Sequence, residues 1–190
     1  MSTSYFKLVT MAEVLLMGIV HAQIPAECLT TAVPEGDDQR GEAVSIDQSV
    51  AEVATPTTQF FGLEVCEETS SGRMVNLTFY LRDDADPDNL IEMPTIGPEV
   101  DPTLVTCARK RLQFDNYYVE RVIIYETAIG IEAMRFEVPY KDTVIGETFG
   151  TPSADATEVV YNFSEETKLV SLSGYETYTG IGGLTLSSLD

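Results

Sequence analysis

The fold is decided by residues 119–142, VERVIIYETAIGIEAMRFEVPYKD. Between Met134 and Val138 the apolar side chains alternate with the charged side chains of Arg135 and Glu137. A period of two residues is typical of a β-strand that has one buried face and one solvated face. The stretch therefore predicts β-sheet.

The sequence that follows, residues 146–189, reads GETFGTPSADATEVVYNFSEETKLVSLSGYETYTGIGGLTLSSL. Short apolar alternations recur in it, separated by Gly, Ser and Thr. Over the whole region we expect a strand pair joined at Thr127–Gly130, a loop that contains Gly146 and Gly150, and a further strand at Leu169–Leu172.

This order of strands and glycine turns resembles the jacalin-like lectin family. The residues that carry the resemblance are Ile129–Ile131, Phe136, Tyr140, Gly146, Gly150, Val159, Leu169–Val170, Leu172–Gly174 and Gly183–Leu186. The resemblance implies an all-β fold, a jacalin-like β-prism of Greek-key sheets. It also implies a non-enzymatic function, the binding of glycans or glycoproteins.

Further strands are expected upstream of this region. Gln59–Val65 and Met74–Leu81 alternate in the same way, and the Ser70–Gly72 turn between them predicts a hairpin. Residues 82–102 are rich in prolines and acidic side chains, so we expect a long surface loop there.

The composition limits the partners of the chain. Its 190 residues suit a single domain, and 31 acidic against 11 basic residues give a net charge of −20. Such a charge repels phosphate backbones and anionic lipids. Nucleic acid is therefore not an expected partner.

Residues 1–22 are interpreted as a secretory signal peptide, with Lys7 before the apolar run Val14–Val20 and cleavage after Ala22. Glu13 interrupts the apolar region, and the alternatives are a buried N-terminal helix or an uncleaved anchor. A run this short does not form a membrane span. We therefore expect a secreted, extracellular protein.

Cleavage at that point would remove the only histidine, His21. A chain without histidine cannot use Ser-His-Asp or Cys-His catalysis. The sequence also has no phosphate-binding loop and no nucleophile elbow. An enzyme is not expected, and a glycosidase-like hydrolase using two carboxylates is the lowest-ranked hypothesis.

Residues 23–56 are expected to be an extended acidic arm or linker before a domain at residues 57–190, because they hold too little apolar surface to fold alone. The arm is either a spacer or a strand donor that joins subunits into a homo-oligomer or an extracellular filament. We also expect a strand from residues 43–65, or from another subunit, to cover the edge at Leu184–Leu186.

Three cysteines lie outside the proposed signal peptide. We favour a Cys66–Cys107 disulfide, since both residues flank expected core strands, and Cys28 is then a free or intermolecular thiol. The alternative is that Cys28 pairs with one of the other two.

Two sequons, at Asn76 and Asn162, predict N-glycosylation of a secreted protein. Asp84, Asp86 and Asp88 alternate as oxygen ligands in a calcium loop do, but the spacing is not that of an EF-hand. They are candidates for a non-standard calcium site, and no other cofactor is expected. The alternative is a solvated acidic loop.

The jacalin resemblance implies a sugar site at a glycine-rich turn that ends in an aspartate. The comparable turn here spans Gly174, Tyr175, Glu176, Tyr178 and Gly180, and it has no aspartate. The two tyrosines are candidates for stacking on a sugar, although turn tyrosines also pack on neighbouring loops.

Overall fold

The structure is a computed structural model that describes residues 29–30, 43–44, 58–83, 85–112, 117–164, 168–177 and 179–189. These residues form strands and turns, with no helix among them, so the expectation of an all-β fold is confirmed. It follows that this part of the chain holds no helix long and apolar enough to cross a bilayer.

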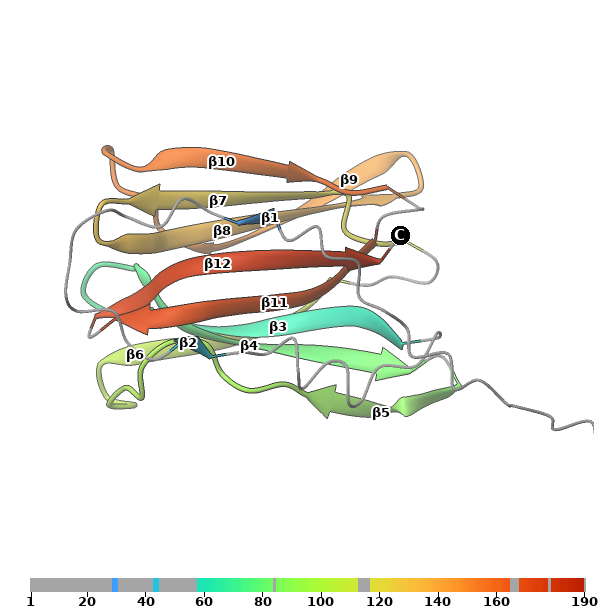
Figure 1. The fold of residues 1–190 in the computed structure, drawn as a ribbon, viewed down its shortest axis with the longest axis horizontal. Helices are drawn as coiled ribbons and strands as arrows, with labels where there is room; N and C mark the ends of the chain where they lie inside the picture. Colours follow the sequence, from blue (N-terminus) through green and yellow to red (C-terminus); the bar gives the residue numbers. More distant parts are fainter. Residues whose placement is uncertain are drawn as a thin grey trace, which may run out of the picture.

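The strands pair into three antiparallel sheets of four strands each. Their bounds are β1 (Leu29–Thr30), β2 (Ala43–Val44), β3 (Thr58–Glu68), β4 (Met74–Asp83), β5 (Asp86–Glu92), β6 (Val105–Arg111), β7 (Arg121–Thr127), β8 (Gly130–Tyr140), β9 (Thr143–Gly150), β10 (Thr157–Asn162), β11 (Lys168–Thr177) and β12 (Gly180–Leu189). Sheet I has the order β5-β4-β3-β6, sheet II β10-β7-β8-β9 and sheet III β1-β12-β11-β2 (Figure 1).

The inner faces of the three sheets enclose one hydrophobic core. Phe60 of sheet I stacks on Phe136 of sheet II with ring centroids 6.3 Å apart, and Phe149 meets Phe136 edge-on at 6.0 Å. Sheet III contributes Leu172 and Leu186, both fully buried. Side chains alternate along a strand, as they do in β8, so each sheet turns one face towards this core. Three sheets around one core make the molecule a three-sided prism.

Sheet III is completed by strands from the segment expected to be an arm. β1 pairs with β12 at Leu29↔Leu186, and β2 pairs with β11 at Val44↔Gly174. The edge at Leu184–Leu186 is therefore covered, as expected, but by a strand that lies upstream of residues 43–65. The expectation that this strand comes from residues 43–65 or from another subunit was therefore wrong, since Leu29–Thr30 of the same chain supplies it.

The loop expected at residues 82–102 is also corrected. Its first part is β5, which pairs with β4 at Leu81↔Ile91. β5 is an edge strand whose side chains are mostly exposed, so it needs no apolar alternation, and an edge tolerates Pro87.

Gly146 and Gly150 lie in strand β9 rather than in a loop. Gly150 ends the strand with φ +79°, and a Cβ atom there would lie 2.3 Å from the carbonyl oxygen of Glu132. Glycine is required at this position because a neighbouring backbone approaches it so closely.

The β3–β4, β7–β8 and β11–β12 turns lie at the same end of the prism as the β5–β6 and β9–β10 links, on the left in Figure 1. We call this the hairpin end. Hydrogen bonds join sheets I and II there: Thr151 N donates to Gly72 O at 2.8 Å, and Gly150 N donates to the Glu67 carboxylate at 2.7 Å.

Candidate functional site

The β11–β12 turn is shorter than the expected lectin loop. Gly174, Tyr175 and Glu176 belong to strand β11, Gly180 begins β12, and Tyr178 lies outside the described residues. The expectation of a loop over Gly174–Gly180 is therefore corrected to a two-residue turn at the tip of a hairpin.

Side-chain hydrogen bonds fix the backbone of this turn. The Thr177 hydroxyl donates to Gly180 O at 3.1 Å and accepts from Thr179 N at 3.3 Å. A threonine hydroxyl that bonds to the backbone two and three residues away stabilises a tight turn. The turn therefore presents its backbone groups in one arrangement.

The β7–β8 turn repeats this construction. Thr127 Oγ1 donates to Gly130 O at 3.2 Å and accepts from Ile129 N at 3.4 Å. A Cβ atom on Gly130 would lie 2.4 Å from the carbonyl oxygen of Ile181, which follows the first residue of β12. The two turns are therefore packed side by side, with Ile129 62% exposed beside the β11–β12 turn.

Tyr175 lies across the backbone of the neighbouring strand. A Cβ atom at Gly182 would lie 2.3 Å from a ring carbon of Tyr175, and one at Gly183 would lie 2.6 Å from another. The two glycines therefore make room for the ring and fix its orientation. The ring remains partly exposed.

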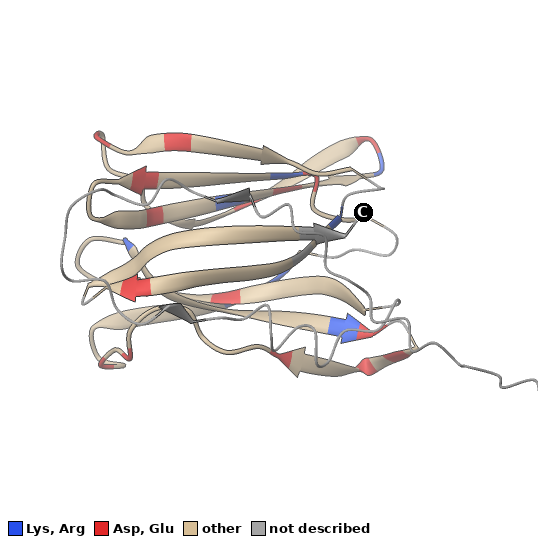
Figure 2. Cartoon of the chain, viewed as in Figure 1, with Lys and Arg blue, Asp and Glu red and all other residues tan. Residues whose placement is uncertain are grey.

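Arg73 connects this turn to sheet I. Its Nη2 donates to the carbonyl oxygen of Thr179 at 2.6 Å, and an N–H bond from a charged group is stronger than one from a neutral group. Acidic residues are also present at the hairpin end of every sheet (Figure 2). Arg73 is thus a cation in an otherwise acidic region.

Sequence reasoning missed a hollow of about 410 Å³ next to Arg73. Its lining residues are Glu68, Ser71, Arg73, Glu132, Thr151, Pro152 and Ser153. They come from the end of β3 with the β3–β4 turn, from strand β8 and from the β9–β10 link, three parts that are far apart in the sequence. The only local signal is two short segments of small polar residues, Ser70–Gly72 and Thr151–Ser153, which look like ordinary turns.

No protein-family model and no curated protein matches the chain, but solved structures do. Single-chain recombinant jacalin superposes with a TM-score of 0.60 at 12% identity, over 87% of this chain and 97% of its own. A mannose-binding jacalin-related lectin from Ananas comosus gives 0.57 at 10% identity, over 85% and 97%. Artocarpin complexed with Me-α-mannose gives 0.55 at 11% identity, over 87% and 100%.

The chain has the jacalin-type β-prism fold. The resemblance read from the sequence is therefore confirmed at the level of the fold.

The disulfide favoured from the sequence is present on sheet I of this jacalin-type prism. Cys66 of β3 and Cys107 of β6 lie directly opposite each other and are joined, with Cα atoms 4.0 Å apart. Cys28 lies outside the described residues.

The two sequon asparagines differ in their surroundings. Asn162 is exposed at the end of β10, whereas Asn76 is partly buried in β4 and its Nδ2 donates to Pro98 O at 3.2 Å. Asn162 is therefore the more accessible of the two sequon asparagines.

Two of the three candidate calcium ligands lie on a strand of the prism. Asp86 and Asp88 are exposed on β5, and Asp84 is not among the described residues. In the part of the chain that the structure describes, no three or more acidic, cysteine or histidine side chains group as metal ligands would.

Proposed function

We propose that this protein is a secreted, non-enzymatic, carbohydrate-binding protein that takes glycans or glycoproteins at the hairpin end of its prism. The fold supports this, because similar solved structures are described as lectins, and one of them is in complex with a biantennary N-glycan.

The observation that carries the proposal is the construction of the β11–β12 hairpin. The ring of Tyr175 packs closely against Gly182 and Gly183, next to a turn that Thr177 and Arg73 fix by hydrogen bonds. An aromatic ring offers an apolar face to the C–H groups of a sugar, and groups fixed in advance lose less entropy on binding. Ring and turn together form a preorganised platform.

The turn lacks the aspartate that the jacalin resemblance leads one to expect. We propose that Glu176, which precedes the turn on β11 and is partly exposed, supplies the carboxylate for a sugar hydroxyl. Gly174 and Gly180 belong to the same hairpin in this proposal, and Tyr178, which lies outside the described residues, stays a candidate for stacking on the sugar.

Secretion is part of the proposal. The Cys66–Cys107 disulfide supports it, because structural disulfides persist in oxidising compartments. The proposed signal peptide at residues 1–22 lies outside the described residues. Assembly through the arm gains no support from β1 and β2, since both pair with sheet III of their own chain.

The test is calorimetric titration of the purified chain with a glycan selected on an array. Tyr175→Ala and Glu176→Gln should each weaken binding about tenfold or more, because one removes the stacking face and the other a charged acceptor. Tyr125→Ala, a partly exposed tyrosine on β7, is the matched control and should bind normally. Unchanged affinity in both hairpin variants would contradict the proposed site.

A further inference from the structure

The hollow at the hairpin end is built from three distant parts of the chain. The end of strand β3 supplies Glu68, the β3–β4 turn that follows it supplies Arg73, strand β8 supplies Glu132, and the β9–β10 link supplies Pro152 and Ser153. Its volume of about 410 Å³ is within the usual range of about 300–1,000 Å³ for small-molecule sites. The hollow is therefore large enough for a sugar ring.

Hydrogen bonds fix the wall that comes from the β3–β4 turn. Ser71 Oγ donates to Glu68 Oε2 at 2.5 Å and accepts from Arg73 N at 3.1 Å. The turn is also closed by backbone bonds, Glu68 N to Arg73 O at 2.8 Å and Gly72 N to Glu68 O at 2.7 Å. The Glu68 carboxylate thus has a defined position.

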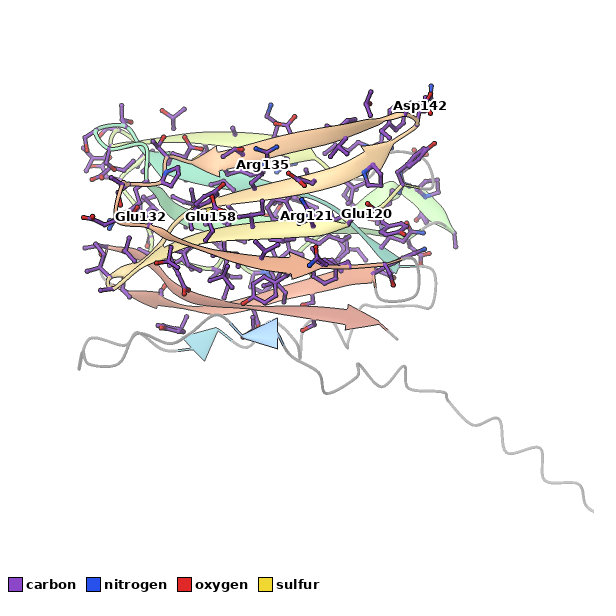
Figure 3. All side chains as sticks on the ribbon, turned by 90° about the horizontal axis from the view of Figure 1, so that it is seen from above. Glu120, Arg121, Glu132, Arg135, Asp142 and Glu158 are labelled. Atoms are coloured by element: carbon purple, nitrogen blue, oxygen red, sulfur yellow. A yellow bond between two sulfur atoms is a disulfide. The ribbon has the colours of Figure 1, made fainter. Side chains whose placement is uncertain are left out.

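The opposite wall is fixed in the same manner. Ser153 N donates to Glu132 Oε2 at 2.8 Å, which ties the β9–β10 link to strand β8. Thr151 N bonds to Gly72 O, so the two walls are also joined to each other. Figure 3 shows Glu132 at the hairpin end and Asp142 at the opposite end of the same sheet. The polar groups are therefore preorganised rather than carried on free side chains.

The lining has the chemistry that a polyol requires. A sugar hydroxyl donates one hydrogen bond and accepts others, and the hollow offers carboxylate acceptors beside the Arg73 donor and the hydroxyls of Ser71, Thr151 and Ser153. Pro152 adds an apolar surface for ring C–H groups. Two neighbouring hydroxyls of a sugar can therefore bond to an acceptor and to a donor of this lining at the same time.

The negative charge of the hollow restricts the kind of ligand that it can bind. The hollow holds two carboxylates and one guanidinium, a formal charge of −1, in a chain whose net charge is −20. Anionic ligands such as phosphates, sulfates and acidic sugars are repelled. A metal ion is not favoured either, because the described residues contain no group of three or more suitable ligands.

We propose that this hollow is a second carbohydrate subsite, separate from the β11–β12 platform, which binds an uncharged sugar through a pair of neighbouring hydroxyl groups. The inference rests on the proposed function. Glu132 accepts from one hydroxyl, Arg73 donates to its neighbour, and Pro152 contacts the ring. Because Arg73 also holds Thr179, the subsite and the platform share one side chain.

The test is an NMR titration of the ¹⁵N-labelled full chain. The probes are methyl α-mannoside and methyl β-galactoside as uncharged sugars, glucuronic acid as an anion and glucosamine as a cation. Occupancy of the hollow is read from the amide signals of Thr151 and Ser153, and occupancy of the platform from those of Thr179 and Gly180. The proposal expects saturable shifts at Thr151 and Ser153 with an uncharged sugar and none with glucuronic acid.

Variants separate the two sites. Glu132→Gln should weaken the response at Ser153 about tenfold, because a charged acceptor becomes neutral. Tyr175→Ala should leave the sugar response of the Ser153 signal unchanged, because Tyr175 belongs to the other site. Glu120→Gln is the matched control, since Glu120 is exposed and lies away from Glu132 in Figure 3. The dispersion of each amide spectrum reports whether the variant folds.

Three results would overturn the inference. Shifts confined to Thr179 and Gly180 would refute the subsite and leave the proposed function standing. A stronger response to glucosamine or to glucuronic acid than to the uncharged sugars would refute the ligand class. The absence of shifts with every probe, together with a glycan array without binding, would refute the proposed function and the subsite with it.

Discussion

At the scale of single residues, two glycines on strand β9 look alike in the sequence but have different roles. Gly150 has φ +79°, and an added Cβ would lie 2.3 Å from a backbone oxygen, whereas at Gly146 the nearest atom, 3.0 Å away, belongs to the flexible side chain of Arg135. We predict that Gly150→Ala lowers the free energy of unfolding by about 2 kcal/mol or more, and Gly146→Ala by less than about 1 kcal/mol. Urea unfolding measures both, and equal losses would contradict the assignment.

The sequons provide a second prediction at this scale. A glycan on Asn76 would remove its bond to Pro98 O and crowd Gly97, where even a Cβ atom would lie 2.8 Å from the Cβ of Asn76. Asn162 is exposed, and its Oδ1 accepts from Arg121 Nε at 3.4 Å, which leaves its nitrogen for a glycan.

In a eukaryotic secretory host, Asn162→Gln should therefore lose the mass of one glycan and Asn76→Gln should lose none. Mass spectrometry of the two secreted variants checks this. A glycan found on Asn76 of the folded protein would show that the β5–β6 link is not closed over this residue.

At the scale of elements, β6 depends on its disulfide. The strand lies at the edge of sheet I, most of its side chains are exposed, and the Cys66–Cys107 bond ties it to β3 across a separation of 41 residues. A cross-link of this span stabilises a fold by about 3–4 kcal/mol, largely by restricting the unfolded chain.

Replacing both Cys66 and Cys107 by Ser should therefore lower the free energy of unfolding by about that amount, as measured in urea. Cys28→Ser is the matched control and should leave the stability unchanged. A double variant within about 1 kcal/mol of the wild type would mean that β6 is held by its pairing alone.

Glu126 makes the stability of sheet II depend on pH. Burial raises the pKa of its carboxyl group above the ordinary value of 4.5, and burial, together with the Glu126 charge, raises the pKa of Tyr161. The folded state therefore binds the Glu126 proton more tightly than the unfolded state does. This contribution is complete below pH 4.5 and is lost as the pH rises through the folded pKa.

Glu126→Gln, which stays neutral, should unfold at higher urea concentration than the wild type at pH 7, and the difference should vanish at acidic pH. The effect should be below about 1 kcal/mol, because the side chain is partly exposed and solvent screens its charge. A difference that does not change with pH would rule out titration of Glu126 as its cause.

Elements with two distinct faces could be predicted from the sequence, and the others could not. Met134 to Val138 alternates because β8 has one face in the core and one in water. β5 has no buried face, so its sequence shows no apolar alternation, and its acidic residues and Pro87 are typical of a loop. β1 and β2 are two residues long, and such pairing depends on the partner strand rather than on a local pattern.

At the scale of the whole molecule, the topology decides what the sequence alone could not show. Sheets I, II and III bring the turns at Gly72, Gly130 and Gly180 to one end of the prism, and the hollow forms where two of these sheets meet (Figure 1). Its lining side chains lie up to 85 positions apart in the sequence, from Glu68 to Ser153, so no local motif could predict that they lie together. The Gly174–Gly180 hairpin, in contrast, could be singled out because its residues are consecutive.

Binding of uncharged glycans at the hairpin end is measured on a glycan array that is probed with the purified wild-type chain. We expect saturable binding to a group of related uncharged glycans and no binding to sulfated or sialylated ones, because both the hollow and the chain carry negative charge. An array without binding, or binding restricted to anionic glycans, would contradict it.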